Sequence, residues 1–129
     1  NILVAKTARA VAEIGYDELT PDLHSAFDRF LQNGEKTDKA CIAKIAIVKA
    51  LRQLNDNNSE LFLRGIRYLQ LEASYGSAVD TAVEIRCQCA YALVDMDDPD
   101  VLYELITLAL DSERAAQLAA RESTKPSFC

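Results

Sequence analysis

The sequence predicts an all-α protein made of repeated helical hairpins, and three observations carry this prediction. The chain has 129 residues, of which 50% are hydrophobic and only 4 are Gly and 3 are Pro. Its abundant Ala, Leu, Glu, Lys and Arg favour helices over strands. Similar helix-start signals recur at "TPDL" (20–23), "NSEL" (58–61) and "DPDV" (98–101). An apolar pattern of helical period follows each signal, which indicates a repeated unit of about 40 residues.

The start signals predict the second helix of each unit. Thr20, Asn58 and Asp98 are residue types whose side-chain oxygens cap helix N-termini by accepting backbone N–H groups. Pro or Ser follows, then an acid, which suits the positive end of the helix dipole. Helices are therefore expected over 22–32, 60–70 and 100–110. The aspartates of "DMDDPD" (95–100) are interpreted as a turn and cap, since the Gly and distal Glu of a calcium-binding loop are missing.

A longer, Ala-rich helix is expected before each of these, over 2–14, 38–54 and 80–96. The connector "LEASYGSAVDTA" (71–82) is expected to be irregular, with Gly76 and Ser77 as helix breakers. Residues 111–123 have the pattern of half a further unit. Together with the start at Asn1 and an aperiodic tail, this pattern is typical of a piece of a longer repeat protein.

A single helical hairpin cannot bury both of its apolar faces, so neighbouring hairpins must cover one another. The sequence therefore predicts a short α-solenoid in one domain, 1–129. Its repeats are expected at about 1–35, 36–71 and 79–111, followed by a partial repeat at 112–123 and a tail at 124–129.

Composition restricts the classes of function. The net charge of −6 argues against a dedicated nucleic-acid binder, whose affinity comes mostly from Lys and Arg at phosphates. No apolar run approaches the ~20 residues that span a bilayer, and the N-terminus lacks a signal-peptide pattern. Three of the four cysteines fall in apolar helical patterns, where free Cys acts as a small hydrophobe. A cytoplasmic protein is expected.

The sequence predicts no catalytic or metal site and no cofactor. Cys87 and Cys89 are two residues apart, which on a helix points their thiols in roughly opposite directions, about 200° apart. The single histidine, His24, is the one histidine base available to activate a thiol, and no triad pattern surrounds it. His24 is expected to be solvated or partly packed.

The pattern resembles HEAT repeats, in particular the bacterial kind related to phycobilisome-lyase-like modules. The residues that carry the resemblance are "IAIVKALRQLNDNNSELFLRGIRYL" (45–69) and "VEIRCQCAYALVDMDDPDVLYELITLAL" (83–110). Arg86 stands where such repeats often place an arginine before their Ala-rich stretch, and it is expected to bond a neighbouring loop or acid. The second unit departs from the pattern, with Lys44 or Ala46 at that place, and an insertion at Tyr75-Gly76 lengthens one connector.

The resemblance implies a right-handed α-solenoid whose second helices line a concave surface where ligands commonly sit. Arg29 and Arg67 occupy equivalent positions in successive repeats, and with Arg64 they are expected to meet a carboxylate, phosphate or acidic peptide unless salt bridges occupy them. Tyr103 is a further expected contact.

The function expected from these residues is a non-catalytic scaffold that binds a protein or peptide partner. The alternatives are an accessory subunit or lyase-like protein handling a bilin chromophore and, less favoured, a HEAT-like nucleic-acid-processing protein.

Overall fold

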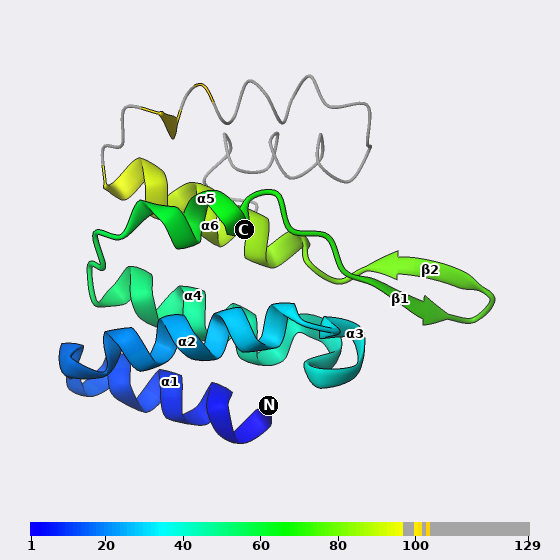
Figure 1. Cartoon of the computed structure of the whole chain (residues 1–129), viewed down its shortest axis with the longest axis horizontal. Helices are drawn as coiled ribbons and strands as arrows, with labels where there is room; N and C mark the ends of the chain where they lie inside the picture. The colour runs from blue at the N-terminus through cyan, green and yellow to red at the C-terminus, as the bar shows by residue number, and fades with distance from the viewer. Residues whose placement is uncertain (97–99, 102, 104–129) are drawn as a thin grey trace. The chain divides into compact units, whose positions relative to one another are not determined.

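The computed structural model describes residues 1–96, 100, 101 and 103, which fall into two compact units. Unit 1 consists of residues 1–56 and 70–81, and unit 2 consists of residues 57–69 and the described residues from Ala82 onward. The described residues form helices and one two-stranded sheet. The prediction of a mainly helical protein is therefore confirmed (Figure 1).

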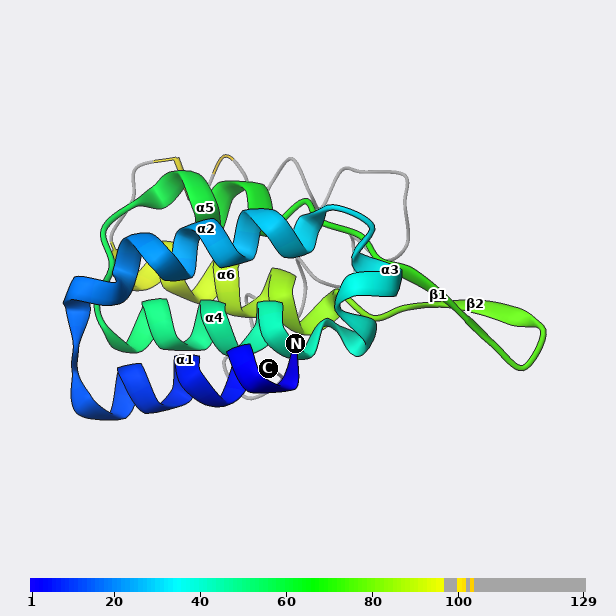
Figure 2. The same cartoon turned by 60° about the horizontal axis from the view of Figure 1, so that its bottom comes forward.

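Unit 1 is built around helix α4 (Ile42–Gln53), which packs against both α1 (Ile2–Ile14) and α2 (Thr20–Leu31). The chain runs in the same direction in α1 and α4 and in the opposite direction in α2 (Figures 1 and 2). A short helix, α3 (Gly34–Thr37), and a 3-10 turn (Lys39–Cys41) connect α2 to α4. Phe27, Ile47 and Leu51 are fully buried, so the core of this unit lies between α2 and α4 and along α4.

Helix α1 has the bounds that the sequence predicts, because both of its ends carry local signals. The side chain of Asn1 accepts a hydrogen bond from the N–H of Ile2 at 2.7 Å. At the other end, Gly15 adopts a left-handed conformation with φ 76°, and its N–H returns to the carbonyl of Val11 at 3.0 Å. A glycine in this conformation is a common helix stop.

Helix α2 begins one residue earlier than a Thr20 cap would allow. Thr20 already has helical angles, φ −53° and ψ −46°, and its N–H bonds to the carbonyl of Asp17. A 3-10 turn, Asp17–Leu19, thus leads directly into the helix, and Leu19 precedes it without a side-chain cap. The prediction of Thr20 as N-cap is wrong, whereas Pro21 and Asp22 do stand in the first turn.

The helix expected to start at Asp38 begins at Ile42 instead. Asp38 still caps it, since its carboxylate accepts the N–H groups of Ala43 and Lys44 at 2.8 and 2.9 Å. This contact is possible because Ala40 and Cys41 both have positive φ, 58° and 57°, and turn the chain back upon itself. Two adjacent non-glycine residues in this region are costly, so the buried hydrogen bonds of Asp38 offset local strain.

The connector expected to be irregular is a β-hairpin. Strands β1 (Leu71–Ser74) and β2 (Ser77–Asp80) pair antiparallel around a turn at Tyr75 and Gly76, whose φ angles are 44° and 82°. Positive φ at both turn residues is typical of a type I′ turn, whose twist suits a two-residue hairpin. The hairpin projects beyond the helices of unit 1 (Figures 1 and 2).

The base of the hairpin is tied to the turn before α4 by one carboxylate. Glu72 accepts hydrogen bonds from the N–H of Ala40 at 2.8 Å, from the amide of Gln70 at 3.0 Å and from the hydroxyl of Thr81 at 2.5 Å. Gln70 also donates to the carbonyl of Asp38 at 2.9 Å. The contacts with Ala40 and Asp38 join residues 32 positions apart and were not foreseeable from local patterns.

Unit 2 contains α5 (Ser59–Gly65) packed against α6 (Val83–Asp95). The predicted Asn58 cap is confirmed, since its side chain accepts the N–H of Glu60 at 3.1 Å. The expected helix over 60–70 is too long, because α5 ends at Gly65 and the chain continues in tight turns. Gly65 lies so close to α6 that a Cβ placed there would fall 2.2 Å from the sulfur of Cys89.

Helix α6 begins at Val83 rather than Asp80, because Asp80 pairs with Leu71 in the hairpin. The expected Asp98 cap, most of the helix expected over 100–110, the segment 111–123 and the tail lie outside the described residues.

The same contact occurs once in each unit, at positions that correspond in the predicted repeats. In unit 1 the ammonium of Lys44 donates to the carbonyl of Phe30 at 3.0 Å and pairs with Asp38 at 3.1 Å, with both side chains fully buried. In unit 2 the guanidinium of Arg86 donates to the carbonyl of Tyr68 at 2.8 Å, and Arg86 is 1% exposed. Arg86 therefore has the structural role expected of it, and Lys44 provides the corresponding cation.

Candidate functional site

The four residues expected to contact a partner are all exposed, which docking requires. Arg29 lies in the last turn of α2, with its guanidinium carbon 5.3 Å from the centre of the Phe30 ring. Arg64 lies in the last turn of α5, and Tyr103 is 69% exposed. Arg29 belongs to unit 1, and Arg64, Arg67 and Tyr103 belong to unit 2.

Arg29 and Arg67, which the sequence places at equivalent positions in successive repeats, differ in backbone conformation. Arg29 is helical, whereas Arg67 follows the end of α5 and its N–H bonds to the carbonyl of Arg64 at 3.2 Å. Arg64 and Arg67 are both exposed, and the hydrogen bond between their backbones places them in one tight turn. Arg64 and Arg67 thus lie three residues apart in one turn of unit 2.

His24 is partly packed, one of the two predicted states, and it is also paired with Asp56. Its Nε2 lies 2.6 Å from Oδ2 of Asp56, and the two side chains are 17% and 9% exposed. Asp56 follows the end of α4, in a turn where Asn55 has φ 56°, so the contact joins α2 to the exit of α4. The sequence reasoning missed this pair because its two members are 32 residues apart.

Burial makes the thiols of Cys41 and Cys89 poor nucleophiles. Cys41, Cys87 and Cys89 are free and buried. Burial raises the pKa of the Cys89 thiol, and it also raises the pKa of Cys41 although a hydrogen bond with Thr81 opposes the effect. Reactive cysteines need the opposite shift, because the thiolate is the attacking species. Cys41 and Cys89 thus act as small apolar side chains, as the sequence predicts.

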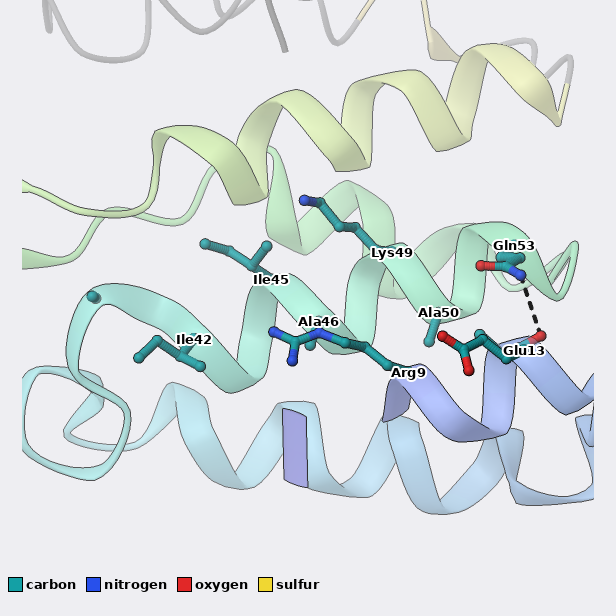
Figure 3. A pocket seen from close by; sticks show the side chains of 10 residues that line it. Arg9, Glu13, Ile42, Ile45, Ala46, Lys49, Ala50 and Gln53 are labelled. Carbon is teal, nitrogen blue, oxygen red and sulfur yellow. Dashed lines mark hydrogen bonds between the residues drawn. The ribbon is translucent and has the colours of Figure 1, made fainter. Parts of the chain in front are cut away.

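A groove of about 390 Å³ runs between α1 and α4 in unit 1 (Figure 3). Its floor includes the buried alanines Ala12, Ala46 and Ala50, and charged side chains of Arg9, Glu13 and Lys49 line it. Gln53 closes one end by donating to the carbonyl of Ala12 at 3.3 Å. The sequence signal for this groove is the alanine spacing of three and four residues, since small residues let two helices approach closely.

The described residues give two further findings that bear on function. Within residues 1–96 and the three positions described beyond them, no group of three or more His, Cys, Asp and Glu is placed to hold a metal ion. In the same part of the chain, no helix combines the length and the apolar character needed to cross a bilayer.

The sequence matches no family model, and neither the curated proteins nor the solved structures compared with it gave a match.

Proposed function

We propose that this chain is a non-catalytic recognition module in which HEAT-like helical hairpins stack as a short right-handed solenoid and bind a protein or peptide partner. The observation that carries the proposal is the repeated cation-to-carbonyl contact, Lys44 to Phe30 and Arg86 to Tyr68. In each unit a cation on the first helix of one predicted hairpin, Lys44 on α4 or Arg86 on α6, donates a hydrogen bond to a backbone carbonyl at the end of the preceding hairpin. A contact that recurs at each joint is what a chain of stacked repeats requires.

The proposed contacts with the partner are Arg64, Arg67 and Tyr103 in unit 2 and Arg29 in unit 1. Arg64 and Arg67 are exposed and lie in one turn, and an arginine side chain can bind a carboxylate of a partner through two parallel hydrogen bonds. Helix α5 is also anchored, since Leu61, Phe62 and Gly65 are buried. A surface held by a packed helix loses little conformational freedom when a partner docks. The buried free thiols support a reducing, cytoplasmic setting.

The test is a comparison of captured partners. The full chain and a variant with Arg64→Glu and Arg67→Glu are used as baits in extract of the native host, followed by quantitative mass spectrometry. A Lys6→Glu variant, which changes an exposed cation on α1, is the matched control. A true partner is retained by the native chain and by the control and is lost from the double variant.

The binding of each retained partner is then measured with purified proteins by calorimetry. The double reversal is expected to weaken the affinity by about 100-fold, the equivalent of roughly 3 kcal/mol for two desolvated charge contacts. Capture of the same proteins, with equal affinity, by the native chain and the double variant would remove this surface from the proposal.

A further inference from the structure

The turn of the β-hairpin places a tyrosine where its backbone is strained. Tyr75 has φ 44°, a left-handed conformation that is an outlier for a bulky side chain. Asn, Asp or Gly normally occupies this position of a type I′ turn, because these residues adopt positive φ at low cost. The next residue, Gly76 with φ 82°, meets the same requirement without strain. Tyrosine therefore lowers the stability of the hairpin at this position.

No packing within the chain offsets this strain. The side chain of Tyr75 is 108% exposed, so water surrounds its ring. Two further large apolar side chains of the hairpin are open to water, Leu71 at 62% and Val79 at 46%. Strained residues persist mostly where a function needs them, for example at a ligand contact. The strain and the full exposure of Tyr75 together indicate a contact with another molecule.

The base of the hairpin is held in place, so its tip stands on a fixed support. Glu72 accepts the N–H of Ala40 at 2.8 Å, and Gln70 donates to the carbonyl of Asp38 at 2.9 Å. These contacts tie the strands to the turn before α4, and the hairpin projects beyond the helices of unit 1 (Figures 1 and 2). A preorganised support reduces the entropy lost on binding, and tyrosine is enriched among the residues that dominate interface energies.

We propose that the hairpin is a docking arm whose Tyr75 ring enters a pocket on a protein partner, and that basic residues rim this pocket. The charge of the arm argues for the rim. Residues 68–85 contain no Lys, Arg or His, and the charged residues of β1 and β2 are both acids, Glu72 and Asp80. Such an arm repels acidic surfaces and is attracted to Lys and Arg. A cation can also stack on the face of a tyrosine ring.

The first measurement tests the strain in the isolated full chain. Tyr75→Asn should raise the urea midpoint of unfolding, because asparagine accepts the left-handed conformation and no packing is lost. Tyr16→Asn is the matched control, since Tyr16 is 46% exposed and its hydroxyl donates to Glu18 at 2.9 Å. This control should not raise the midpoint. A midpoint of Tyr75→Asn at or below that of the native chain would overturn the argument from strain, and the proposal with it.

The second measurement tests the contact with purified proteins that the native chain retains from host extract. Calorimetry should give at least one partner whose affinity falls at least ~10-fold with Tyr75→Asn but changes little with Tyr75→Phe or Tyr16→Asn. A partner that is weakened by the Arg64→Glu and Arg67→Glu double variant but not by Tyr75→Asn would overturn the arm and leave the proposed function standing. A partner with the opposite response supports the arm alone.

The third measurement tests the sign of the rim and the kind of partner. Ala78 is exposed on β2, so Ala78→Lys should weaken binding of that partner and Ala78→Glu should not. Equal binding of the two variants would overturn the basic rim. Phosphatidylcholine vesicles are the control for a lipid surface, which exposed aromatic side chains also enter. Co-sedimentation of the native chain with these vesicles that Tyr75→Asn abolishes would overturn the protein pocket.

Discussion

The close contact between Gly65 and Cys89 predicts how Gly65→Ala changes stability. The substitution should be destabilising in the native chain and stabilising when Cys89 is replaced by alanine. The Cβ of an alanine at position 65 would lie 2.2 Å from the sulfur of Cys89, whereas unstrained contacts are about 3.5–4 Å. The next neighbour, the Cβ of Cys89, would be 3.4 Å away. The overlap is therefore with one atom, the sulfur.

Gly65→Ala should lower the free energy of unfolding by about 1–3 kcal/mol, the usual cost of overpacking a close-packed contact. Cys89→Ala alone should cost about 1 kcal/mol for the lost buried sulfur. In the Cys89→Ala background the overlap is absent, so the new methyl group fills the vacated space and alanine favours the helix. There Gly65→Ala should raise stability by up to about 1 kcal/mol.

Urea denaturation followed by far-ultraviolet circular dichroism measures all four proteins, and the double-mutant cycle should give a coupling of about 2–3 kcal/mol. Cys87→Ala is the matched control, since Cys87 is also buried on α6 but is not among the nearest neighbours of the added methyl group. Gly65→Ala should remain destabilising in that background. An equal effect of Gly65→Ala in the native and Cys89→Ala backgrounds would refute the close approach of α5 to α6.

Three further predictions concern buried or hydrogen-bonded ionisable groups. Asp38→Ala should cost about 3–5 kcal/mol, because the fully buried Lys44 ammonium loses its counter-charge. Adding Lys44→Met should recover part of that loss in urea titrations, and an additive double variant would contradict the coupling. The raised pKa values of Cys41 and Cys89 keep these thiols protonated in the folded chain while unfolded thiols ionise above the ordinary value of 9.0. The free energy of unfolding should therefore fall as pH rises above 9, by up to ~1.4 kcal/mol per pH unit for each thiol, and Cys89→Ala should reduce this slope. The pKa of Glu72 is lowered, chiefly by the hydrogen bond from the Thr81 hydroxyl, so its stabilising effect is present above the ordinary value of 4.5 and is lost as pH falls below it. Glu72→Gln should flatten the acid limb of the stability curve, and an unchanged limb would show that this carboxylate does not hold the hairpin.

The sequence predicted the helices best where the signals are local. The bounds of α1 follow from Asn1 and Gly15, and the start of α5 follows from Asn58, because each of these residues bonds to backbone groups within a few positions. The buried character of Cys41, Cys87 and Cys89 follows from their place in apolar helical patterns. The structural role of Arg86 was expected from the HEAT resemblance.

The hairpin was missed because its stability is not local. Its turn is Tyr-Gly rather than the Asn-Gly or Asp-Gly that marks a type I′ turn in a sequence, and its strands have four residues each. The bonds that hold its base involve Ala40 and Asp38, about 30 residues away. Local propensity carries no information on such partners.

In the candidate site, too, local sequence patterns predicted some features, whereas contacts between distant residues decided others. Composition and helical period already determined that Arg29, Arg64 and Arg67 would be polar positions on or beside the second helices. The structure adds that α5 ends at Gly65, where a Cβ would lie 2.2 Å from the sulfur of Cys89, and that the N–H of Arg67 bonds to the carbonyl of Arg64 in the turn that follows. The pairing of His24 with Asp56 and the alanine-floored groove were likewise decided by which helices meet. Periodicity determines which face of a helix is apolar, whereas the neighbour that covers this face depends on contacts between residues far apart in the chain.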